Sequence, residues 1–131
     1  MFNVTGDATN GYTIEMSKGD TGAIRIRANV TTRGSGDPYT FGENDRAVFS
    51  IKDGSGSLVK EKVSEIENNT FVVLFRNPDT DDLAPGTNYT WDIRYVINPY
   101  YDETGRIIDG DQVVTPRTPR PMNLLNVVGS I

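Results

Sequence analysis

Residues 88–98, with the sequence NYTWDIRYVIN, decide the fold class of this chain. Large apolar residues occupy every second position of the segment: Tyr89, Trp91, Ile93, Tyr95 and Ile97. The positions between them are mainly polar: Thr90, Asp92 and Arg94. Consecutive side chains of a β-strand project to opposite faces, so this order builds one apolar face and one hydrated face. A helix would scatter the same residues around its axis. The segment therefore predicts a half-buried strand.

The same alternation continues along the chain in both directions. It is clear in residues 22–29 and 46–52, and weaker runs occur at residues 12–16, 58–63, 71–75, 106–108 and 122–128. Residues 58–63 (LVKEKV) are rich in Lys and Glu, which is typical of an edge strand. Residues 71–75 (FVVLF) are apolar on both faces. They predict a central strand covered by the core on one side and by a neighbouring subunit or a loop on the other.

Residues that favour turns separate these runs about every ten to fifteen positions. The sequence Asp53-Gly54-Ser55-Gly56 predicts a hairpin, because Gly adopts the positive φ that tight turns require. Residues 101–111 predict a second hairpin, and residues 77–86 predict an acidic loop that ends at a Pro-Gly turn. Residues 115–121 (TPRTPRP) predict an extended edge or crossing segment that leads to a last strand.

Together these elements predict a single all-β domain over residues 1–131. About seven or eight antiparallel strands at regular spacing are typical of a β-sandwich. A chain of 131 residues buries about two-thirds of its unfolded surface, so it needs no disulfide or metal in order to fold.

The composition limits the classes of function. The chain has no Cys and no His, which excludes thiolate chemistry, zinc–sulfur sites and catalytic triads that contain His. A net charge of −5 argues against binding to a phosphate backbone. No apolar stretch is long enough to span a membrane. Residues 1–6 lack the features of a signal peptide, so we expect synthesis and folding in the cytoplasm. The composition predicts no cofactor and no enzymatic activity.

One short stretch resembles a known structural corner. The sequence around Leu83, Pro85, Gly86, Tyr89 and Trp91 is similar to the corner that opens a late strand in fibronectin type III and immunoglobulin-like domains. The resemblance implies an immunoglobulin-like β-sandwich. It also implies that the Tyr89 hydroxyl contacts a nearby backbone group, as in a tyrosine corner. Such a motif indicates fold and carries no information about function.

A second resemblance covers nearly the whole chain. It depends on a succession of motifs: Gly19-Asp20-Thr21-Gly22, residues 39–49, the turn at Asp53-Gly54, Asp79-Thr80, residues 83–94, Asp109-Gly110-Asp111 and residues 113–116. This order resembles small tail and baseplate proteins of tailed phages and prophages of Gram-positive bacteria, in particular the N-terminal module of baseplate upper proteins. One departure is the stretch at residues 98–109 (NPYYDETGRIID), an insertion longer than the short turn that the resemblance implies.

Two groups of carboxylates are candidate sites. Asp79, Asp81 and Asp82 supply oxygens of the kind that Ca²⁺ prefers, and the alternative is a solvated acidic turn. Asp109 and Asp111 could form a catalytic carboxylate pair with a member of the first group, as in glycosidases, but no third group sets their pKa values apart.

The insertion at residues 98–109 carries a candidate binding site. Tyr100 and Tyr101 could stack on sugar rings, with Asp102 and Arg106 beside them as polar contacts. The aromatic residues Trp91 and Tyr95 belong to the apolar face and are expected in the core.

The resemblance implies a non-enzymatic structural protein of the virion tail, made in the bacterial cytoplasm. Its expected partners are other phage structural proteins and further copies of itself. Apolar residues in the ranges 71–75 and 122–128, together with Val48, suggest a subunit interface, although a central strand buried on both faces explains them equally well. The alternative function is a carbohydrate-binding or cell-surface adhesion module that uses residues 98–109.

Overall fold

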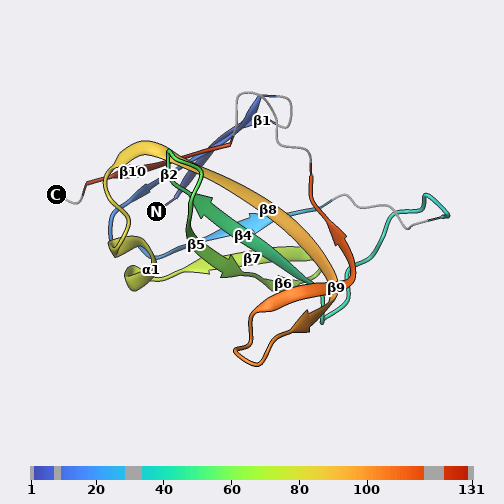
Figure 1. The fold of residues 1–131 in the computed structure, drawn as a ribbon. Coiled ribbons are helices and arrows are strands. Elements are labelled where there is room, and N and C mark those ends of the chain that lie inside the picture. Colours follow the sequence, from blue (N-terminus) through green and yellow to red (C-terminus); the bar gives the residue numbers. More distant parts are fainter. Residues whose placement is uncertain (1, 8–9, 29–33, 117–122, 130–131) are drawn as a thin grey trace.

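The structure, a computed structural model, describes residues 2–7, 10–28, 34–116 and 123–129 as an all-β sandwich (Figure 1). The larger sheet contains β1 (Asn3–Asp7), β2 (Gly11–Ser17), β10 (Leu124–Val128), β8 (Gly86–Tyr101), β4 (Arg46–Lys52) and β5 (Leu58–Val63) in this order, and β9 (Ile107–Val114) also pairs with β8. The smaller sheet contains β3 (Gly22–Ile26), β7 (Thr70–Phe75) and β6 (Glu65–Glu67) in this order. The short helix α1 (Asn77–Asp81) follows β7.

The strand order is that of an immunoglobulin-like sandwich. In such domains the B, E and D strands form one sheet and the G, F, C and C′ strands form the other. Here β3, β7 and β6 occupy the first set of positions, and β10, β8, β4 and β5 occupy the second. The predicted all-β sandwich is therefore confirmed. The described residues contain ten strands, more than the seven or eight predicted, and β10 runs parallel to β2 although only antiparallel strands were predicted.

β8 is the longest strand and arches across the molecule (Figure 1). One edge of β8 pairs with β4, and the other edge pairs with two separate strands. β10 pairs with the start of β8, from Gly86 to Thr90, and β9 pairs with its second half from Tyr95 onward. The predicted Pro-rich segment, residues 115–121, comes between β9 and β10 in the sequence, and its residues 117–121 lie outside the described residues.

The core lies between the two sheets and is rich in aromatic side chains. Phe49 of β4 is fully buried; its ring stacks on Trp91 of β8 with centroids 5.2 Å apart and meets the edge of Phe75 of β7 at 5.6 Å. A second cluster joins Phe41, Phe71 and Tyr95. Trp91 and Tyr95 are both buried, as the alternation in β8 predicted.

The outer face of the larger sheet is partly covered by the chain itself. Val48 and Val96 project away from the sandwich core and are nevertheless buried, because Ile107 of β9 packs on them. The hairpin of β8 and β9 thus folds over the outer face of its own sheet. Val48, one of the residues that suggested a subunit interface, is covered within the chain, whereas Leu74 of β7 stays 40% exposed.

Both predicted hairpin turns have the same construction. Oδ1 of Asp53 accepts hydrogen bonds from the backbone N–H groups of Ser55 and Ser57 and from the Ser55 hydroxyl. Gly56 follows with φ of +85°. The turn that begins at Asp102 repeats this pattern between β8 and β9. In each turn the Asp carboxylate closes the hairpin with local hydrogen bonds.

Candidate functional site

The predicted acidic loop contains the helix α1, which lies at one end of the sandwich (Figure 1). Pro78 in the first turn of a helix costs no hydrogen bond, and an acidic residue near the helix start is favourable. Asp79 lies in this first turn, and its Oδ2 atom accepts a hydrogen bond from the backbone N–H of Arg76 at 2.8 Å. On the far side, the buried Thr80 hydroxyl donates to the Asp20 carbonyl at 2.7 Å, and Asn77 Nδ2 donates to the Gly19 carbonyl at 2.7 Å.

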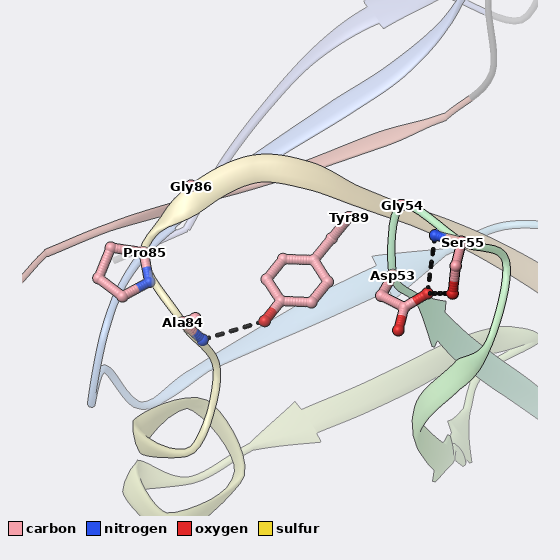
Figure 2. A pocket seen from close by; sticks show the side chains of 7 residues that line it. All are labelled: Asp53, Gly54, Ser55, Ala84, Pro85, Gly86 and Tyr89. Carbon is pink, nitrogen blue, oxygen red and sulfur yellow. Dashed lines mark hydrogen bonds between the residues drawn. The ribbon is translucent and has the colours of Figure 1, made fainter.

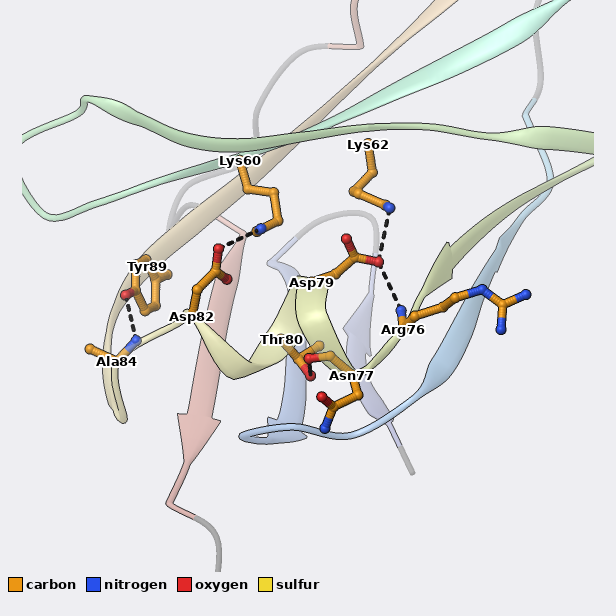
Figure 3. A network of polar contacts seen from close by, with 9 residues as sticks. All are labelled: Lys60, Lys62, Arg76, Asn77, Asp79, Thr80, Asp82, Ala84 and Tyr89. Atoms are coloured by element: carbon orange, nitrogen blue, oxygen red, sulfur yellow. Dashed lines mark hydrogen bonds and ion pairs between the residues drawn. The ribbon is translucent and has the colours of Figure 1, made fainter.

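Two carboxylates of this region point toward lysines of β5 (Figure 3). Lys62 Nζ lies 2.9 Å from Asp79 Oδ2, and Lys60 Nζ lies 2.9 Å from Asp82 Oδ2. The lysines are two positions apart on a strand, so they share a face, and α1 lies opposite that face. Asp81 is exposed. The structure therefore does not bring the three predicted Ca²⁺ ligands together, and no group of three metal-binding side chains occurs among the described residues.

We expect Asp79→Asn to lower the free energy of unfolding by about 1–2 kcal/mol, since it weakens a helix cap and an ion pair. Partial burial favours a higher pKa for Asp79, but the Arg76 N–H and Lys62 outweigh it and hold this pKa below its ordinary value. The stabilisation is therefore present above about pH 4 and is lost as the pH falls through the lower folded-state pKa. Urea unfolding of the wild-type chain and of Asp79→Asn between pH 7 and pH 2 measures this loss. If the difference between their free energies of unfolding stayed constant down to pH 2, an ionic contribution of Asp79 would be contradicted.

The segment after α1 forms the corner that the sequence indicated. Leu83 is fully buried, and the chain then passes through Pro85 and Gly86 into β8. The Tyr89 hydroxyl accepts a hydrogen bond from the Ala84 backbone N–H at 3.0 Å (Figure 2). This is the contact that a tyrosine corner makes. A hollow of about 350 Å³ lies beside the ring, lined by Asp53, Gly54, Ser55, Ala84, Pro85, Gly86 and Tyr89.

We expect Tyr89→Phe to lower the free energy of unfolding by about 1 kcal/mol, because the variant keeps the ring and removes the acceptor of the Ala84 N–H. Chemical denaturation measures the difference. Tyr12→Phe is the matched control, since Tyr12 is exposed on β2, and we expect it to change stability by less than about 0.5 kcal/mol. Equal effects of the two substitutions would rule out a structural role for the corner hydrogen bond.

The stretch at residues 98–109 lies within the predicted second hairpin and does not form a separate loop. It consists of the end of β8, the turn at Asp102 and the start of β9. Tyr100 and Tyr101 are about half exposed and are consecutive residues of β8. The register of the pairing between β8 and β9 shifts between these two residues, so the regular alternation of a strand is interrupted at this point.

The polar residues of the predicted binding site make contacts within the chain. Asp102 Oδ1 accepts three hydrogen bonds that build its own turn. The Arg106 guanidinium forms two hydrogen bonds with the Glu61 carboxylate of β5, at 3.2 and 3.3 Å. The Tyr100 hydroxyl donates to Asp111. The four predicted residues lie on one hairpin, and three of them hold its shape.

A buried carboxylate at the base of this hairpin was missed by the sequence analysis. Asp45 is 3% exposed and accepts hydrogen bonds from the Gly42 N–H at 2.8 Å, the Asn98 N–H at 2.9 Å and the Tyr39 hydroxyl at 3.0 Å. Burial, and then this hydrogen bond, raise the pKa of Tyr39 and keep its hydroxyl protonated as a donor. Asp45 thereby joins the segment before β4 to the bend in β8, where Asn98 has a positive φ of 49°.

The candidate catalytic pair at Asp109 and Asp111 belongs to the same surface. Asp111 accepts hydrogen bonds from the Tyr100 hydroxyl and from Asn98 Nδ2. These two contacts lower the pKa of Asp111. A general acid in glycoside hydrolysis needs the opposite shift, because it must stay protonated near neutral pH.

Comparison of the chain with protein-family models, with curated proteins and with solved structures found no match. The fold therefore defines the class of the protein, an all-β sandwich domain with immunoglobulin-like strand order. No helix within the described ranges is long and apolar enough to cross a membrane.

Proposed function

We propose that this domain is a non-enzymatic structural module of a phage or prophage tail or baseplate, which takes part in virion assembly through protein–protein contacts. The observation that carries the proposal is the position of its exposed apolar side chains. All the large apolar side chains that are exposed among the described residues lie in strands: Val4, Tyr12, Leu58, Val59, Val63, Leu74, Tyr100, Tyr101, Ile108, Val113, Leu124 and Val128. Exposed apolar surface on rigid sheets suits the surface of another protein.

The charged side chains support the same proposal. Ion pairs within the chain involve Arg46, Lys52, Lys60, Lys62 and Arg106, each with a carboxylate on a neighbouring element. Paired charges give little attraction to a polyanion, and they keep the strands and turns in a fixed arrangement. A rigid surface loses little conformational entropy when it binds another protein, which favours assembly.

The experiment is coexpression of the chain with each structural protein encoded by its neighbouring genes, followed by size-exclusion chromatography with light scattering. The expected result is a complex of fixed stoichiometry with at least one of them. Failure to bind every such protein at concentrations of about 100 μM would overturn the proposal. A double substitution, Ile108→Asp with Val113→Asp, tests the apolar residues that β9 exposes, and Glu103→Lys in the adjacent turn is its charge-changing control.

The alternative is a module that binds carbohydrate on a cell surface through the β8–β9 hairpin. It is favoured by the half-exposed ring of Tyr101 beside the hairpin turn. A glycan array of the wild-type chain and Tyr101→Ala tests it, with Tyr12→Ala as the matched control on another strand. Binding that Tyr101→Ala alone abolishes would support this function. An array without any binding would exclude it.

A further inference from the structure

β1 lies at an edge of the larger sheet, as the described strands form it. Among the described strands it pairs only with β2, from Asn3 opposite Glu15 to Asp7 opposite Gly11. All five of its residues are exposed. The other edge of such a strand presents backbone N–H and C=O groups that can pair with a further strand.

The other sheet edges carry features that discourage strand addition. β5 contains Lys60 and Lys62 and has a register shift opposite β4, and β9 has a register shift opposite β8. β6 has only three residues, and two of them are Glu. β3 exposes Arg25. Charges, irregular register and short length are the usual means of protecting an edge. β1 has a continuous register with β2 and contains neither Lys nor Pro.

Next to this edge the apolar face of the larger sheet is uncovered. Val4 lies directly opposite Ile14, so the two side chains share the face that packs in the core. Ile14 is fully buried, whereas Val4 is 51% exposed and Tyr12, on the same face of β2, is 38% exposed. The apolar face thus continues past the area that the rest of the chain covers.

We propose that two copies of this chain pair through β1, antiparallel and about a two-fold axis at Thr5, so that their larger sheets become continuous. In this register Thr5 faces Thr5 of the second copy, Val4 faces Gly6, and Asn3 faces Asp7. It is the only two-fold antiparallel register that pairs all five residues of each β1 strand. It also places no charged residue opposite a like charge.

Gly6 faces Val4 of the second copy in this register. Gly6 lies directly opposite Tyr12 on β2 and has φ of +111°, and a Cβ atom there would clash with the Gly11 carbonyl oxygen, so the position accepts only glycine. Val4 of the second copy would lie beside Gly6, on the same face as the Tyr12 ring. On the opposite face, Thr13 lies next to Thr5, and the pairing creates a row of four threonines across the two copies. Such β-branched residues favour strands.

The contact is small, so we expect weak association. A five-residue edge with two apolar side chains from each copy buries less than the area of a stable dimer, and a Kd of about 10–1,000 μM is the expected range. The inference rests on the proposed function for its expectation that the domain works in several copies. It names the chain itself as one partner of that assembly.

The test is a charge exchange at Thr5, measured by sedimentation equilibrium of the full chain. Thr5→Lys and Thr5→Glu each place two like charges face to face, and each is expected to weaken self-association at least about fivefold. An equimolar mixture of the two variants brings Lys and Glu together and is expected to restore association to the wild-type level. Val59→Lys on β5 is the matched control at the other edge and is expected to change nothing.

A second measurement needs no substitution. Amide hydrogen exchange in β1 is expected to slow as the protein concentration rises, while exchange in β5 stays constant. A wild-type chain that remains monomeric to about 1 mM would overturn the inference, as would unchanged association of Thr5→Lys. A monomer that still binds a structural protein encoded by a neighbouring gene would overturn pairing through β1 and leave the proposed function intact. A β1-paired dimer that binds no such protein would support the pairing and overturn the proposed function.

Discussion

Replacing Phe49 with Ala is expected to lower the free energy of unfolding by about 3–5 kcal/mol. Phe49 is fully buried, and its ring contacts Trp91 of the same sheet and Phe75 of the opposite sheet. Its removal leaves a cavity between the two sheets, at the position where they are joined most directly by aromatic contacts. Such a loss is a large part of the stability of an ordinary domain.

Urea unfolding followed by tryptophan fluorescence measures this effect, because Trp91 is the only Trp of the chain and stacks on Phe49. Leu74→Ala is the matched control: Leu74 lies on β7 beside Phe75 and points outward, with 40% of its surface exposed. We expect this control to cost less than about 1 kcal/mol. If Phe49→Ala cost no more than the control, the assignment of the core would be wrong.

The second large effect is expected for Asp45→Ala, which removes the acceptor of three hydrogen bonds in a buried place. The N–H groups of Gly42 and Asn98 and the Tyr39 hydroxyl would lose their partner. Leaving buried donors unsatisfied costs more than an average hydrogen bond contributes, and we expect a loss of about 3–5 kcal/mol. Thermal and chemical unfolding both report it.

Two further variants separate the contributions to this effect. Tyr39→Phe removes one donor and keeps the carboxylate, so we expect a loss of about 1 kcal/mol. Asp45→Asn keeps the shape of the side chain but presents an amide NH₂ to groups that are themselves donors, and an intermediate loss is expected. Wild-type stability of Asp45→Asn would show that packing, and not hydrogen bonding, accounts for the geometry of this bend.

Most strands that could be predicted from the sequence have an apolar face. β4 was predicted with its observed bounds, and β8 was recognised because its alternation is long. β5 has no fully buried residue, and its observed bounds were predicted from a run rich in Lys and Glu that is typical of an edge strand. β1 and β6 were missed for a physical reason. β1 has no buried side chain and β6 has three residues, so neither carries an apolar period that a sequence pattern can reveal. Hydrogen bonds to neighbouring strands define them, and those depend on the fold.

The helix α1 was interpreted as a loop although the sequence contained a signal for it. Asn77-Pro78-Asp79 combines Pro in the first turn with an acidic residue that caps the start, a pattern typical of a helix N-terminus. The strand at residues 106–108 was predicted too short, since β9 extends to Val114. Its polar residues and Gly110 interrupt the alternation, and pairing with β8 continues through them.

The candidate sites illustrate what a sequence cannot provide. The contact of Tyr89 with a backbone group follows from a motif, and such motifs depend only on local chain geometry. The partners of Asp79 and Asp82 are lysines about twenty residues earlier in the sequence, and the partner of Arg106 is Glu61. Charged residues grouped in a sequence suggested a metal or ligand, but their contacts are set by strands that are brought together only by folding.

The parallel pairing of β2 with β10 has a consequence for how the protein is made. Ile14 and Met16 lie opposite Leu125 and Val127, residues that the ribosome adds more than a hundred positions later. Until these residues leave the exit tunnel, a nascent chain has no strand between β2 and β8, and one side of its core stays hydrated. The domain can therefore reach its final stability only after β10 has been synthesised, and a chain that ends before this strand would be open to proteolysis and aggregation.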